Sequence, residues 1–75
     1  MTVMNYKEEI NNICEQYKTS ELYSTIVNRT ELLVSKIKRK EYIIGVLKEN
    51  SEDLCRNDPE RMLGTINLLI QMHLG

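Results

Sequence analysis

The side chains best suited to nucleophilic or metal chemistry are one histidine, His73, and two cysteines, Cys14 and Cys55. The cysteines lack the CxxC and Cys/His spacings of metal sites, and two cysteines are too few for a disulfide scaffold. A metal site or a Cys–His nucleophilic pair would need a thiol within hydrogen-bond reach of His73, and a third group to orient the ring. No local spacing supplies this. We therefore predict no catalytic, metal-binding or cofactor-binding residue, and two reduced thiols.

Two pairs of carboxylates are neighbours in the chain, Glu8 with Glu9 and Glu52 with Asp53. Adjacent residues on a helix point about 100° apart, so these pairs do not converge on one substrate atom as general acid–base chemistry requires. The sequence also lacks a Gly-rich phosphate loop, a GxSxG elbow, an HExxH motif and a calcium loop. We predict that the protein is not an enzyme.

The strongest charge asymmetry is a basic run that contains Lys36, Lys38, Arg39 and Lys40. Such a run could contact an acidic partner or the phosphates of a nucleic acid. The formal net charge of −1, the lack of a helix-turn-helix signature and the absence of aromatic residues beside the run for base stacking favour a solvated face or an acidic protein partner. Nucleic acid is the alternative ligand.

Helices must position these side chains, because strand-like alternation never persists and no glycine precedes Gly45 and no proline precedes Pro59. An apolar stripe at spacings of three and four predicts a first helix over about residues 3–18, with Val3, Tyr6, Ile10, Ile13 and Tyr17. The phase of this stripe breaks between Lys18 and Leu22, so a tight turn is expected there.

A second stripe predicts a long helix over about residues 20–50, with Tyr23, Ile26, Thr30, Leu33, Ile37, Lys40, Ile44 and Leu47. Asp58 as N-cap and Pro59 at the first helical position predict a third helix over about residues 59–73. Because glycine weakens a helix, Gly45 and Gly64 are expected to mark close crossings between helices.

The lengths of these helices predict how they pack. At about 1.5 Å per residue, the central helix would be about 45 Å long, roughly twice the length of each neighbour. Two short helices folded back on its halves as antiparallel hairpins would give a bundle two helices thick, too thin to bury three apolar faces. We therefore predict one all-α domain over residues 1–75, short-long-short, completed as a helical bundle by a second copy or a helical partner. Cys14 and Cys55 would lie at opposite ends of the central helix, too far apart for a disulfide.

This geometry indicates a non-catalytic protein–protein interaction module, such as a small adaptor, co-chaperone or inhibitor that masks or holds a partner surface. The predicted contact residues are apolar side chains of the second and third helices: Ile26, Leu33, Ile37, Ile44, Leu47, Leu63, Ile66, Leu69 and Ile70. The alternative is a small dimeric nucleic-acid-binding regulator that uses the run from Lys36 to Lys40. No apolar run is long enough for a membrane span or a signal core, so we expect a cytoplasmic protein without a membrane or small-molecule partner.

Overall fold

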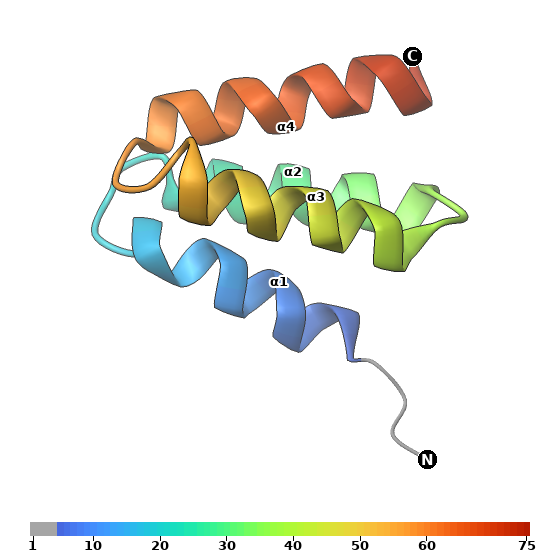
Figure 1. Cartoon of the computed structure of the whole chain (residues 1–75). Helices are drawn as coiled ribbons and strands as arrows, with labels where there is room; N and C mark the ends of the chain where they lie inside the picture. Colours follow the sequence, from blue (N-terminus) through green and yellow to red (C-terminus); the bar gives the residue numbers. More distant parts are fainter. Residues whose placement is uncertain (1–4) are drawn as a thin grey trace.

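The computed structural model describes residues 5–75, which form four α-helices and one short 3-10 helix. These elements are α1 (Tyr6–Cys14), η1 (Glu15–Tyr17), α2 (Tyr23–Lys36), α3 (Lys40–Asp53) and α4 (Pro59–Leu74). Successive helices run in alternating directions along the bundle (Figure 1). No strand occurs within residues 5–75, so the all-α prediction is confirmed, with one helix more than expected. The predicted place of Val3 on the first helix lies outside the described residues.

The predicted single helix over residues 20–50 is wrong, because the chain leaves helical geometry at residues 37–39 and reverses direction. Ile37 is extended, with φ −96° and ψ 148°, and α3 runs back along α2 (Figure 1). The dense positive charge of the basic run disfavours one continuous helix, since like charges a turn apart repel. The Lys40 ammonium group also stabilises the break, because its Nζ donates to the Ile37 carbonyl at 2.7 Å.

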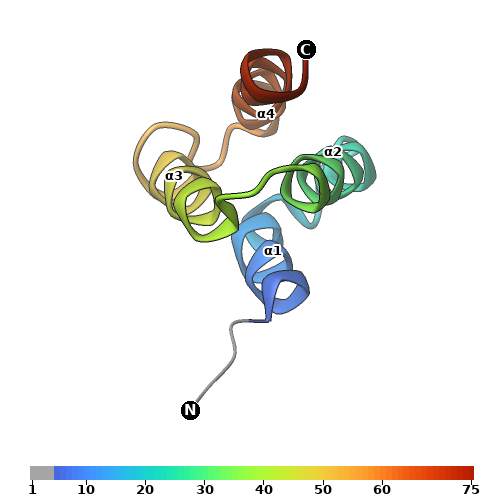
Figure 2. The same cartoon turned by 90° about the vertical axis from the view of Figure 1, so that its right-hand side faces the viewer.

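The reversal decides what covers the apolar faces. On one side of the α2–α3 pair lies α1, and on the other lies α4, which packs mainly on α2 (Figure 2). Every α-helix contributes to the buried apolar core, which consists of Ile10, Ile13, Cys14, Tyr17, Ile26, Leu33, Val34, Ile43, Ile44, Leu47, Cys55, Met62 and Ile66. The bundle is 34 Å in its longest dimension, shorter than the predicted central helix. The two-layer arrangement is therefore wrong, and the argument for a dimer that rested on it no longer applies.

The turn from α3 to α4 follows the local sequence signals. Asn57 adopts a left-handed conformation, with φ 63°, which asparagine tolerates better than most residues. The Asp58 side chain then accepts a hydrogen bond from the Arg61 N–H at 3.1 Å, and Pro59 occupies the first helical position. The predicted start of the last helix is confirmed.

The two helical glycines are not crossing points. Gly45 and Gly64 are exposed, and a methyl group added at either position would meet no atom within 4 Å, so the predicted close crossings are wrong. Within the described part of the chain, none of the helices combines the length and the hydropathy needed to cross a bilayer.

Candidate functional site

The histidine and the cysteines lie at opposite ends of the bundle. His73 is in the last turn of α4, whereas Cys14 ends α1 and Cys55 follows α3, at the end where η1 leads into α2 (Figure 1). Among residues 5–75, no group of three or more His, Cys, Asp or Glu side chains could hold a metal ion. The structure therefore does not bring a thiol to His73.

Cys14 and Cys55 both lie near Tyr17, whereas the prediction placed them at opposite ends of one long helix. Because α3 reverses along α2, Cys14 and Cys55 arrive at the same end, and both are free and buried. Burial, followed by the nearby Cys55 and Cys14 thiols, raises the pKa of Tyr17 to about 12. The Tyr17 hydroxyl donates to the Cys55 carbonyl oxygen at 2.8 Å and so joins η1 to the α3–α4 turn. We call this the sealed end of the bundle.

The Cys14 thiol is poorly suited to nucleophilic chemistry. Burial raises its pKa to about 11, although the Thr30 hydroxyl beside it acts in the opposite direction. A thiol attacks as the thiolate, and this thiol is protonated at neutral pH. The fully buried Thr30 Oγ1 has no hydrogen-bond partner of standard geometry. Cys14 and Thr30 therefore belong to the buried core of the bundle and not to a reactive site.

The predicted partner-contact residues are used inside the chain. Five are buried in the chain's own core, namely Ile26, Leu33, Ile44, Leu47 and Ile66. The other four are partly buried and pack against that core, namely Ile37, Leu63, Leu69 and Ile70. Periodicity identified these residues as apolar contact positions, but it assigned the contacts to a partner. The folded-back α3, which was not foreseen, lets the chain's own helices cover them. The five buried side chains are therefore covered by the chain itself.

The basic run is split by the α2–α3 loop. Lys36 ends α2, and Lys38 and Arg39 lie in the loop, all three exposed. Lys40 begins α3, is partly buried and donates from its ammonium group to the Ile37 carbonyl, and it does not line the same hollow as the other three. The four cations are therefore not one strip, and three of them form a separate group.

That group surrounds a hollow of about 450 Å³ at the open end of the bundle, opposite the sealed end. Its lining is Lys36, Ile37, Lys38, Arg39, Tyr42 and His73, and we call it the basic corner. The Arg39 guanidinium lies 5.2 Å from the centre of the Tyr42 ring, and Tyr42 is 55% exposed. The prediction that no aromatic residue lies beside the run was wrong, because the first turn of α3 brings Tyr42 to it.

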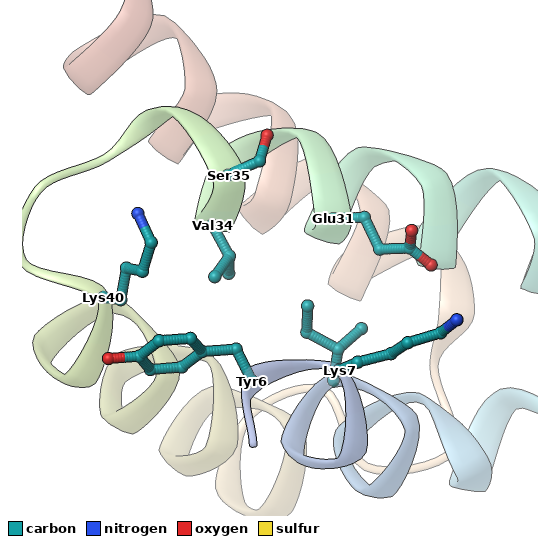
Figure 3. A pocket seen from close by; sticks show the side chains of 7 residues that line it. Tyr6, Lys7, Glu31, Val34, Ser35 and Lys40 are labelled. Atoms are coloured by element: carbon teal, nitrogen blue, oxygen red, sulfur yellow. The ribbon is translucent and has the colours of Figure 1, made fainter. Parts of the chain in front are cut away.

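A second hollow, a groove of about 270 Å³, lies between α1, α2 and the start of α3 (Figure 3). Its base is apolar, formed by Ile10, Val34 and the ring of Tyr6, while charged and polar side chains stand around it. Lys40 and Tyr6 lie toward one end, and Lys7 and Glu31 toward the other (Figure 3). The Tyr6 hydroxyl donates to Glu41 Oε1 at 3.2 Å.

The charges of this groove offset one another, since Lys7 and Lys40 are balanced in part by Glu31. Its lining therefore holds charges of both signs, with a small positive excess. The sequence placed Tyr6 and Ile10 on an apolar stripe, but it gave no signal for Lys7, Glu31 or Ser35. The basic corner, where charge of one sign surrounds an apolar base, is the stronger candidate site.

No protein-family model, curated protein or solved structure matches this chain.

Proposed function

We propose that this chain is a non-catalytic protein-binding module whose basic corner holds an acidic segment of a partner protein. One observation carries the proposal: the cations of the α2–α3 loop and the distant His73 surround Ile37 and Tyr42 in one hollow. Carboxylates of a partner would face the Lys and Arg side chains, and an apolar side chain would cover the base. The module would act by occupancy, as a small adaptor, co-chaperone or inhibitor that holds or masks its partner.

The size and charge of the corner favour protein over nucleic acid. Nucleic-acid binders neutralise about 6 to 10 phosphates in well-studied cases, whereas this corner offers Lys36, Lys38 and Arg39. The formal net charge of −1 adds no long-range attraction for a polyanion.

A nucleic-acid-binding regulator is the second candidate function, and the exposed Tyr42 ring beside Arg39 is the observation in its favour. An exposed aromatic ring can stack on a base, which contributes about 1–3 kcal/mol per base. With three phosphate contacts, the affinity for a single strand would fall with salt at a log–log slope of about −2.

Fluorescence anisotropy tests both functions in one format. The probes are a labelled peptide of alternating Glu and Leu and a labelled single-stranded oligonucleotide of similar length. The corner variant carries Lys36→Glu, Lys38→Glu and Arg39→Glu. The matched control carries the same charge change at Lys18, Arg29 and Lys48, which are exposed elsewhere.

We expect the corner variant to lose at least about tenfold in peptide affinity, as the loss of charge-assisted contacts implies, while the control keeps its affinity. Equal affinity of the two variants, or no peptide binding at low salt, would refute the proposal. Tight oligonucleotide binding that only the corner variant loses would favour the second function.

A further inference from the structure

The most exposed large apolar side chains of the described chain lie on α3 and α4. Four large side chains there are more than half exposed: Tyr42 on α3 at 55%, Leu54 at the end of α3 at 58%, and Leu68 and Met72 on α4 at 56% and 67%. They are exposed because α4 packs mainly on α2 and meets α3 less closely. We call this surface the α3–α4 face.

Contacts at one end of this face fix the orientation of α4. The Cys55 Sγ lies 3.7 Å from the Thr65 Oγ1, so Thr65 lies on the flank of α4 that looks toward α3. Leu68 and Met72 follow Thr65 by three and seven positions, which places them on or beside the same flank.

Contacts at the other end fix the orientation of α3. Tyr42 and His73 line the same hollow, so Tyr42 lies on the flank of α3 that looks toward α4. Glu49 and Asp53 follow Tyr42 by seven and eleven positions and lie on the same flank. The apolar side chains of both helices therefore share one face with these two carboxylates.

The two ends of the α3–α4 face differ in charge, although the exposed Arg61, four positions before Thr65 on α4, offsets part of the negative charge at the sealed end. The basic corner, with Lys36, Lys38 and Arg39, is at the open end. Toward the sealed end, Glu49 and Asp53 line a shallow hollow of about 380 Å³ with Asn50 and Leu54. From Tyr42 to Asp53 along α3 is about 16 Å at the helical rise.

We infer that a second copy of this chain docks on the α3–α4 face, with the basic corner of each copy against Glu49 and Asp53 of the other. This inference rests on the proposed function, since it identifies the acidic segment as residues 49–53 of another copy. A two-fold axis through the middle of the face exchanges its ends, so each positive end meets a negative end. Tyr42 at the basic corner, together with Leu68 and Met72 on α4, is removed from water in both copies.

The expected dimer is weak. A specific interface covers about 800 Å² per partner, whereas the entire accessible surface of this chain is 5319 Å². The face is two helices wide and carries four large exposed apolar side chains. We therefore expect a dissociation constant of about 10 to 100 μM, lower at low salt because the end contacts are charged.

A charge-swap experiment tests this pairing by sedimentation equilibrium of the full chain. Variant A carries Glu49→Lys and Asp53→Lys, and variant B carries Lys38→Glu and Arg39→Glu. The control carries Glu15→Lys and Glu21→Lys, exposed carboxylates away from the face. Circular dichroism of each variant checks that the helices are retained.

We expect the unmodified chain and the control to dimerise, and A and B alone to be at least about tenfold weaker. Mixing A with B restores both end contacts. The unchanged basic corner of A meets the unchanged Glu49 and Asp53 of B, and the new lysines of A meet the new glutamates of B, so a mixed dimer forms. A chain that stays monomeric at about 500 μM, which is well above the expected dissociation constant, would overturn the inference. So would a dimer that A leaves intact, or A and B that fail to pair.

The peptide assay separates this inference from the proposed function. Variant A keeps the basic corner, so it binds the acidic peptide at least as well as the unmodified chain. A monomeric chain that binds the peptide would refute the dimer alone. A chain that binds no peptide would refute the proposed function.

Discussion

The two ends of the bundle use polar side chains in opposite ways. At the sealed end, Tyr17 is 1% exposed and its hydroxyl donates to the Cys55 carbonyl oxygen, while Asp58 caps α4. At the open end, the first turn of α3 has no side-chain cap, and Lys36 and Lys38 stand in solvent around an apolar hollow. The Tyr17 hydroxyl and the Asp58 carboxylate are satisfied within the chain, so they stabilise the fold. The polar groups at the open end are free to interact with a partner.

This contrast has a physical origin in the two turns. The α3–α4 turn contains a left-handed Asn57, an N-cap and a proline, which together fix its backbone. The α2–α3 turn has none of these, and Lys40 supplies its side-chain contact to the backbone. A rigid turn can bury its neighbours, whereas a turn rich in charge keeps its side chains in water.

The largest expected difference between the ends is the effect of removing an aromatic ring. Tyr17→Ala leaves a cavity among buried side chains and orphans the Cys55 carbonyl, so it should lower the free energy of unfolding by about 3–5 kcal/mol. Tyr42→Ala removes an exposed ring and should change it by less than about 0.5 kcal/mol. Urea denaturation measures both. Similar losses would show that the open end is as tightly built as the sealed end.

A smaller effect is expected from alkaline pH, and it belongs to the sealed end. Burial raises the pKa of Cys14 from 9.0 to about 11 and that of Tyr17 from 10.0 to about 12. The folded state therefore keeps protons that the unfolded chain releases, so the unfolding free energy is undiminished below pH 9 and falls as pH rises through 11 and 12.

We expect the Cys14 contribution to this loss to be on the order of 2 kcal/mol. Guanidinium unfolding at a series of pH values measures it, and Cys14→Ala should flatten the curve between pH 9 and 11. Ser24→Ala, an exposed change on α2, serves as the control and should keep the full loss. A pH-independent stability above pH 9 in the unmodified chain would contradict this account.

The smallest expected effect is a gain in stability. Thr30 is fully buried on α2 beside Cys14, and its hydroxyl has no partner of standard geometry. Thr30→Val removes an unsatisfied polar group at nearly constant volume, so the free energy of unfolding should rise by about 1 kcal/mol. Thr25→Val, at an exposed position of the same helix, controls for helix propensity. A loss of stability on Thr30→Val would mean that the hydroxyl makes a contact that stabilises the folded state.

Several features of the fold were predictable because their causes are local. The helical class follows from spacings of three and four, and the start of α4 follows from Asp58 and Pro59, whose effects act within one turn of backbone. The break at residues 37–39 was not predictable in this way. Leu33, Ile37 and Ile44 keep the apolar period across it, and no glycine or proline marks it.

The candidate site was predictable only in part. The basic run is visible in the sequence, and it does supply Lys36, Lys38 and Arg39. Its convergence with Tyr42 and His73 was not foreseen, because it requires α3 to reverse and the far end of α4 to return to the same corner. The α3–α4 face was not predicted either. Its exposed residues lie off the main apolar stripe, and they come together only because α3 reverses.

The amino-acid sequence by itself determined that this chain is helical, where its last helix begins, and that positive charge is concentrated in one short run. Only the tertiary structure decided that the second and third helices are separate, that five of the predicted contact residues are core, and which cations share a hollow. The physical reason is range. Capping and periodicity act over a few residues, whereas burial is shared among segments that meet only after the chain has folded back.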